Sequence, residues 1–218
     1  MRILTEILGI QYGLLELEDV PDMGHVLARA FSEREPPAIA VGMSSDDIEG
    51  LVGIFGPKAL AENLSIIART TSNELVGALL TEDFGTPPPI GIAGAPSRFA
   101  PVGALLDSLE DEYRTGHSVV PGSHLHLFML GVSDGFGDAG IAQRMIKLCL
   151  ENGAQRKYRL AVTEATGRVS QHVFRKLGFQ ERYARSYKDF LYEGRLVFES
   201  IEAHGGATLM ERVVGGAA

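Results

Sequence analysis

Hydrophobic and polar residues change their spacing along this chain in a way that predicts both strands and helices. Residues 10–18 partly alternate, which is typical of a strand with one buried face. Residues 64–68 and 75–80 are apolar runs on either side of a Thr-Thr-Ser-Asn turn. Two such runs around a polar turn predict a β-hairpin.

Three helices are expected in the first half of the chain. The first covers 21–33, with its apolar residues on one stripe, and ends before Pro36 because the residue that precedes a proline is pushed out of the helical region. A serine at position 44 or 45 is expected to cap the second helix. The third covers 101–113 and follows a loop, 83–97, that is rich in Pro and Gly. A loop of that length is either functional or disordered.

The second half has the most regular pattern, a strand, a glycine loop, a helix, a strand, a helix and a strand. In order, these are 124–132, 133–140, 141–152, 158–163, 166–176 and the residues from Phe179. Gly178 is placed to end the last helix in the left-handed conformation. The whole pattern predicts an α/β (α+β) fold.

Length and composition allow one domain over residues 1–218. Hydrophobic residues make up 45% of the chain, which is enough for a sizeable core. No apolar run approaches the roughly 18 residues of a membrane span, so no membrane partner is expected. Glutamates at 6, 16 and 18 interrupt the N-terminal apolar residues, unlike those of a secretion signal. We therefore expect a cytoplasmic protein.

Charge and cysteine content narrow the classes of partner. The net charge of −8 argues against nucleic acid and favours a cationic substrate. An anionic cofactor would have to be held by local groups. Cys149 is the only cysteine, so an intramolecular disulfide and a cysteine-based zinc site are excluded, and no metal site is expected. Cys149 lies in an apolar helical pattern, and we expect it to be buried.

The glycine loop permits more than one interpretation. Residues 135–140 fit the spacing G-x-G-x-x-G, whose backbone N–H groups bind phosphate at the start of a helix. As a dinucleotide site, the loop would use Glu164 for the ribose. Against this, Ser133 and Asp134 separate the strand from the first glycine, and too few residues follow for a six-stranded parallel sheet. An ordinary glycine-rich turn is the third interpretation.

The same segment resembles the cofactor motif of the GNAT superfamily of N-acetyltransferases. LGVSDGFGDAGIAQRMI has that motif's strand end, short loop and helix start, although Gly137 stands where the family usually has Arg or Gln. ATGRVSQHVFRKLGF resembles the family's later helix, with Phe174 in place of the usual Tyr. The resemblance implies a mixed, twisted sheet of about seven strands whose parallel strands splay apart around acetyl-CoA. The residues it assigns to the cofactor are Leu130, Gly131, Val132, Gly137, Asp138, Ala139, Gly140, Ile141, Ala142, Ser170 and Phe174.

Further features resemble the arylalkylamine N-acetyltransferase branch, especially its insect type. Glu35-Pro36 is similar to the Glu-Pro signature of that branch, and Thr166 and Ser170 match its pair of hydroxyl residues. The tail YKDFLYEGRLVF with the later AHGG is also similar. The resemblance implies acetyl transfer to a primary amine of a small molecule, by a monomer or homodimer.

The chemistry requires a general base, because an alkylamine is mostly ammonium at neutral pH. Glu35 is the first candidate and His126 the second. Period two places His126 on one face of its strand with His124, Phe128 and Leu130. Thr166 or Ser170 is a candidate to relay a proton to the thiolate in place of the absent Tyr.

Three hypotheses follow. The first is an acetyltransferase in which the amine attacks acetyl-CoA directly. The second is a degenerate GNAT fold that binds an acyl-CoA as a sensor or scaffold, motivated by Gly137, Asp138 and Phe174. The third is a nicotinamide-dependent dehydrogenase.

Overall fold

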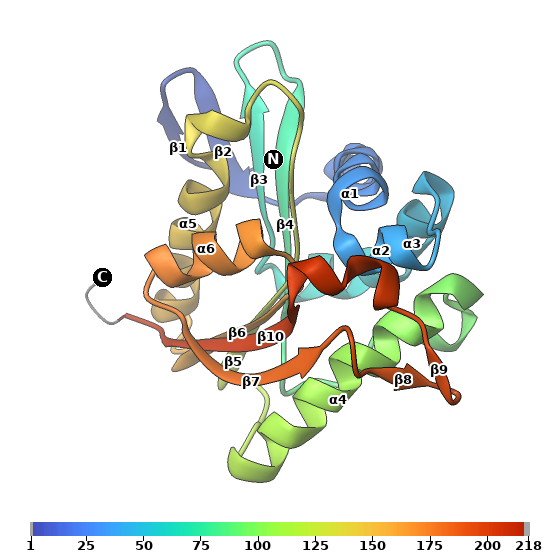
Figure 1. Ribbon diagram of the computed structural model, residues 1–218. Coiled ribbons are helices and arrows are strands. Elements are labelled where there is room, and N and C mark those ends of the chain that lie inside the picture. Colours follow the sequence, from blue (N-terminus) through green and yellow to red (C-terminus); the bar gives the residue numbers. More distant parts are fainter. Residues whose placement is uncertain (1, 216–218) are drawn as a thin grey trace.

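An eight-stranded sheet runs through the centre of the computed structural model, which describes residues 2–215 apart from the side chain of Asp138 (Figure 1). The strand order is β1-β2-β3-β4-β5-β6-β10-β7. The strands are β1 (Arg2–Ile7), β2 (Ile10–Leu14), β3 (Ile66–Thr70), β4 (Leu75–Asp83), β5 (His124–Val132), β6 (Leu160–Ala165), β7 (Gln180–Ser186) and β10 (Gly206–Val213). A separate two-stranded ribbon pairs β8 (Leu191–Tyr192) with β9 (Arg195–Leu196).

The sheet is mixed and mostly antiparallel. Strands β1 to β5 pair antiparallel in chain order, β5 and β6 are parallel, and β10 returns antiparallel between β6 and β7. A dinucleotide-binding fold requires an open, mostly parallel sheet. This topology therefore excludes that fold, and the dehydrogenase hypothesis loses its basis.

Helices cover both faces of the sheet, and the sheet separates two hydrophobic cores. On one face lie α1 (Val20–Arg34), α2 (Pro36–Ala40), α3 (Ser45–Glu62) and α4 (Ala100–Gly116), and on the other lie α5 (Ile141–Gln155) and α6 (Arg168–Lys176) (Figure 1). Short 3-10 turns are η1 (Leu17–Asp19), η2 (Ile92–Gly94), η3 (Ser97–Phe99), η4 (Gly137–Ala139) and η5 (Glu199–His204). Within residues 2–215, no helix has both the length and the apolar character that a bilayer span requires.

The local signals in the sequence place most of these boundaries. Ser44 caps α3 through its hydroxyl, which accepts a hydrogen bond from Asp47 N. Gly178 has φ of +81° after α6, a conformation that glycine adopts without strain. Helix α1 stops at Arg34, and α2 then begins at Pro36 with Glu35 as its N-cap. Pro36, predicted to end the first helix, therefore also begins α2.

The parallel strands separate beyond a short paired stretch. Strand β5 pairs with β6 only from His124 to His126, opposite Leu160 to Val162, although both strands continue. The GNAT-type sheet with splayed parallel strands is thus present, with one strand more than expected.

A bulge in β5 corrects one sequence prediction. Leu80 pairs with Met129 and Thr81 with Leu127, so Phe128 is an extra residue in the strand. Phe128 and Met129 both pack in the core under α1, α3 and α4, whereas Leu130 packs on the opposite side. The prediction that His126 and Leu130 share a face is wrong, because the extra residue reverses the alternation.

Candidate functional site

The N-terminus of α5 presents unsatisfied backbone donors beside the separated strand ends. Gly140 is the N-cap in the left-handed conformation, with φ of +70°, and no side chain caps the helix there. The first N–H groups of a helix have no intrahelical partner, and the helix dipole favours an anion beside them. The residues expected to hold a cofactor here are gathered around this point: Gly137 and Ala139 lie in η4, and Ala142 lies in the first turn of α5. The side chain of Asp138 lies outside the described residues.

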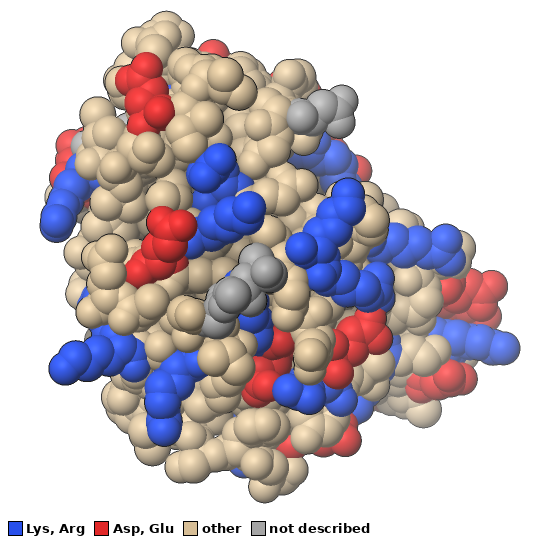
Figure 2. Space-filling model, turned by 90° about the vertical axis from the view of Figure 1, so that its left-hand side faces the viewer, with Lys and Arg blue, Asp and Glu red and all other residues tan. Residues whose placement is uncertain are grey.

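The two helices on this face of the sheet carry charged side chains that are mostly basic, despite the negative net charge. Helices α5 and α6 carry Arg144, Lys147, Arg168, Arg175 and Lys176 against the single acid Glu151. Figure 2 shows numerous Lys and Arg side chains on the face that holds these helices. Arg175 pairs with Glu181, and the other basic side chains add local positive charge to this face of an acidic protein.

The end of β5 makes close contacts with α1. Gly131 faces α1 so closely that a Cβ there would lie 3.0 Å from the Cβ of Ala30. Arg34 Nη2 donates a hydrogen bond to the carbonyl oxygen of Val132 at 2.7 Å, and its Nη1 lies 2.6 Å from Asp134. Arg34 therefore ties the end of α1 to the start of the glycine loop. Leu130 and Val132 pack against the core beneath α5, and Ile141 is buried there.

Glu35 lies at the junction of α1 and α2, against the end of β6. Its Oε2 accepts a hydrogen bond from Ala38 N at 2.5 Å, and Pro36 packs within 3.5 Å of where a Cβ on Gly167 would lie. Burial raises the pKa of Glu35 to about 7, although hydrogen bonds from Thr166 and the Ala38 backbone oppose the shift. A carboxyl with that pKa is suited to take a proton near neutral pH.

The two hydroxyl residues, Thr166 and Ser170, have different contacts in the structure. Ser170 closes the first turn of α6, since its Oγ accepts from Gly167 N and donates to Gly167 O. Thr166 instead contacts Glu35 through its side chain, and its carbonyl accepts a 2.5 Å hydrogen bond from Tyr187. Burial and the neighbouring Glu35 raise the pKa of Tyr187 well above its ordinary value.

Phe174 differs from its sequence assignment. It is buried and stacks edge-on with Phe179, with ring centroids 5.0 Å apart. Its ring fills the core beneath α6, so the structure gives it a packing role where a cofactor contact was predicted. The hydrophobic stripe of α6 explains the placement, because Phe174 belongs to that buried stripe.

His126 is held between two carboxylates from neighbouring strands. Its Nδ1 lies 3.0 Å from Glu82 Oε1, and its Nε2 lies 2.6 Å from Glu164 Oε2. Burial alone would lower the pKa of His126, but Glu164 and Glu82 outweigh it and raise the pKa well above its ordinary value. An imidazolium has no lone pair to accept a proton, so this geometry favours Glu35 over His126 as the base.

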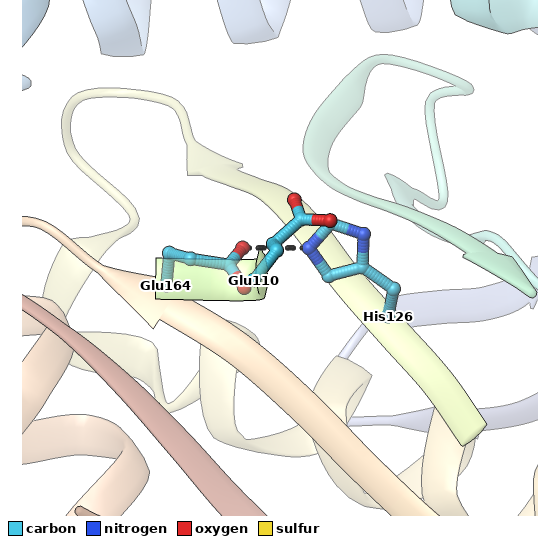
Figure 3. A group of neighbouring side chains, drawn as sticks. All are labelled: Glu110, His126 and Glu164. Atoms are coloured by element: carbon cyan, nitrogen blue, oxygen red, sulfur yellow. Dashed lines mark hydrogen bonds and ion pairs between the residues drawn. The ribbon is translucent and has the colours of Figure 1, made fainter. Parts of the chain in front are cut away.

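Glu110 on α4 completes a cluster with Glu164 and His126. Figure 3 shows Glu110 lying across the hydrogen bond that joins the other two side chains. One ligand atom from each residue lies within 4.8 Å of the other two. Burial and then the charge of Glu164 raise the pKa of Glu110 to about 7.

Glu110 and His126 of this cluster line a cavity of about 420 Å3 under the loop that precedes α4, and Glu164 lies beside them. Its walls combine aromatic rings with charged groups, and they include Phe55, Phe84, Phe99, Phe128, Lys58, Glu82, Asp107, Glu110, Arg114 and His126. The Pro- and Gly-rich loop before α4 contributes Phe84, Thr86, Pro88, Pro89 and Ile92 to the lining. Helix α4 is strongly acidic, since only Arg114 balances its four carboxylates.

Sequence reasoning did not find Glu82, Glu110 or Lys58. Glu82 is the direct cross-strand partner of His126, and Lys58 Nζ donates to it at 2.6 Å. These contacts depend on the register of β4 against β5 and on the docking of α3 and α4. The only available signal was an acid among apolar residues at the end of a predicted strand.

Several solved structures have the same fold. The C-terminal condensation domain of Ebony, solved in complex with beta-alanyl-dopamine, matches with a TM-score of 0.87 and 15% identity over 95% of this chain and 100% of that chain. Arylalkylamine N-acetyltransferase 2 from Aedes aegypti matches with a TM-score of 0.79 and 22% identity over 94% and 99% of the two chains. Polyamine N-acetyltransferase from Drosophila melanogaster, which forms N-acetylagmatine, matches with a TM-score of 0.74 and 18% identity over 94% and 99%.

No family model matches the sequence. The structural matches, all below 25% identity, establish the fold, which is that of the GNAT N-acetyltransferases.

Proposed function

We propose that this protein transfers an acetyl group from acetyl-CoA directly to a primary amine of a small molecule, with Glu35 as general base. The observation that carries the proposal is the Glu35 carboxyl. It lies at the open end of the gap between β5 and β6, and its pKa is raised to about 7. In this position the carboxylate attracts an ammonium and can remove its proton at neutral pH.

The donor side is supported by α5 and its surroundings. The backbone donors at the start of α5 and the basic residues of α5 and α6 suit the phosphates of CoA. Main-chain donors would replace the Arg or Gln side chain that Gly137 lacks. Acetyl-CoA supplies the activated thioester.

One residue can serve both proton transfers. Glu35 takes the proton that the ammonium loses, and the amine nitrogen forms its bond to the carbonyl carbon. The carbon–sulfur bond breaks, and the acylated nitrogen releases its second proton to solvent. The leaving thiolate has a conjugate-acid pKa of roughly 8.5, above that of Glu35. Glu35 can therefore return the same proton to sulfur, by way of Thr166 or water. This would remove the need for a Tyr at position 174.

A second candidate is the transfer of an aminoacyl group in place of acetyl. It is favoured by the 0.87 TM-score with a condensation domain bound to beta-alanyl-dopamine. The two candidates differ only in the donor, and a direct comparison of donors separates them.

The test incubates the protein with acetyl-CoA or β-alanyl-CoA and a panel of arylalkylamines and diamines. Mass spectrometry detects the acylated amine, and free CoA is measured alongside. We expect acetylated amine, its loss in Glu35→Gln, and its retention in Glu33→Gln, which removes an exposed charge two residues away. Binding of either CoA thioester without product would favour the sensor or scaffold hypothesis.

A further inference from the structure

Glu164, which lies beside the cavity-lining residues Glu110 and His126, has an unsatisfied acceptor. Glu164 has a side chain only 3% exposed, and its Oε1 has no hydrogen-bond partner, while its Oε2 accepts from His126. A buried carboxylate oxygen without a partner is costly. Glu110 faces it from α4, and burial together with the charges of Asp111 and Glu164 also raises the pKa of Asp107, one turn earlier.

The positive charges nearby are already engaged. Lys58 pairs with Glu82, and His126 is shared between Glu82 and Glu164. Arg114 lies 3.7 Å from Glu110, but its guanidinium also covers the ring of Phe84 at 3.9 Å and donates to the Phe84 carbonyl. Asp107 and Glu110 are two carboxylates, and within residues 2–215 Arg114 is the one cation that forms an ion pair with either of them. The cavity therefore has more negative than positive charge.

The cluster lies at the closed end of the gap between the parallel strands. The β5–β6 pairing holds up to His126 and Val162, so the strands leave no room for a donor at that level. Glu35 contacts Thr166. Thr166 follows Glu164 by two residues, in the direction in which β5 and β6 separate. Two residues of extended strand span roughly 7 Å. Glu35 and the cluster are therefore separated by a distance that one extended small molecule can span.

We propose that Glu110 and Glu164 bind a second cationic group of the acceptor, so that the preferred acceptors are amines with a positive charge at each end. The inference rests on the proposed function and specifies its substrate class. The aromatic walls formed by Phe55, Phe84 and Phe128 accommodate the apolar linker between the two charges.

A metal ion is the competing occupant, and the geometry is less suited to it. Nε2 of His126 already hydrogen-bonds Glu164, and the imidazolium would first have to lose a proton to become a ligand. The cavity of about 420 Å3 with aromatic walls also exceeds what an ion alone would require. An organic cation uses both the charge and the apolar volume.

The test compares 1,4-diaminobutane with butan-1-amine, which has the same carbon chain but one charge. We expect the wild type to show a kcat/KM about tenfold or more higher for the diamine, since tenfold is the effect of one modest charge-assisted contact. Glu110→Gln keeps the shape of the side chain and should bring the ratio close to one by slowing only the diamine. Asp111→Asn removes a neighbouring exposed charge on α4 and should leave the ratio within about twofold of the wild type.

Calorimetry of diamine binding without any donor separates this inference from the proposed function. Binding that weakens in Glu110→Gln would uphold the cation site even if no amine were acylated. Equal kcat/KM for the two amines, or an equal loss for both in Glu110→Gln, would overturn the inference while leaving acyl transfer intact. A rise in melting temperature with Zn2+ or Mn2+, together with loss of diamine turnover on adding a chelator, would assign the cluster to a metal and overturn it as well.

Discussion

Replacing Glu35 with Gln should change the pH dependence of stability in a predictable direction. The raised pKa means that the folded protein holds the Glu35 proton more tightly than the unfolded chain does. Its contribution therefore stabilises the fold at low pH and is lost as the pH rises from about 4.5 to about 7. Gln can still accept the hydrogen bond from Ala38 N but has no proton to lose.

The magnitude follows from the size of the pKa shift. Each unit corresponds to about 1.36 kcal/mol, so a shift from 4.5 to about 7 gives a ceiling of roughly 3 kcal/mol. Because Glu35 is only half-buried, solvent screens part of this cost, and we expect about 2 kcal/mol. For a chain of this size, that corresponds to roughly 4–8 °C in melting temperature.

Thermal unfolding of both proteins at pH 4.5 and pH 8 measures the effect. At pH 8 the melting temperature of Glu35→Gln, relative to that of the wild type, should be higher than it is at pH 4.5. The expected gain is the roughly 4–8 °C given above. An equal difference at both pH values would refute the assignment of a raised pKa to Glu35.

The pH–rate profile tests the same group in its chemical role. If Glu35 deprotonates an ammonium, kcat/KM of the wild type should rise through about pH 7 and then level off. Glu35→Gln should lose this limb together with a factor of about 10²–10⁴ in rate. A profile that climbs without a plateau towards the pKa of the amine would contradict a role for Glu35 as base.

Three other predictions address the frame around the site. Arg69→Ala should cost about 3–5 kcal/mol in urea unfolding, because it removes the buried guanidinium that pairs with Asp19 and Asp22, and a loss below about 1 kcal/mol would contradict this. Gly77→Val should weaken acetyl-CoA binding in calorimetry more than diamine binding, since a Cβ there would lie 2.9 Å from Ile141 at the start of α5; equal weakening would contradict it. Cys149 is fully buried, and burial raises its pKa to about 12, so Ellman's reagent should react with it only in concentrated urea; rapid reaction in buffer would show that the site opens.

Much of the fold could be predicted from local signals in the sequence. The pattern places β5 at its observed bounds and α5 at its observed start, because a buried strand and an amphipathic helix each have a clear period. Strand β1 was missed because it is an edge strand with mostly exposed side chains, so its alternation carries little hydrophobic contrast. The insertion of β10 between β6 and β7 depends on long-range pairing that no local pattern contains.

The candidate site was predicted less completely for the same reason. Glu35 was identified because Glu35-Pro36 resembles the Glu-Pro signature of the arylalkylamine N-acetyltransferases, and the structure brings it beside Thr166. The state of His126 depends on Glu82 and Glu164, which reach it from two other strands. The bulge at Phe128 also changes which residues face the cavity, and its sequence has no glycine or proline to mark it.

Direct transfer from the CoA thioester to the amine is the central claim, and a single-turnover experiment tests it most directly. Enzyme in excess is mixed with acetyl-labelled acetyl-CoA and an amine, quenched over time, and separated into protein, amine and CoA fractions. The account predicts that label appears in the amine at the rate at which free CoA appears, with none on the protein. Label that accumulates on the protein before it reaches the amine, or label that remains on CoA although the thioester is bound, would contradict it.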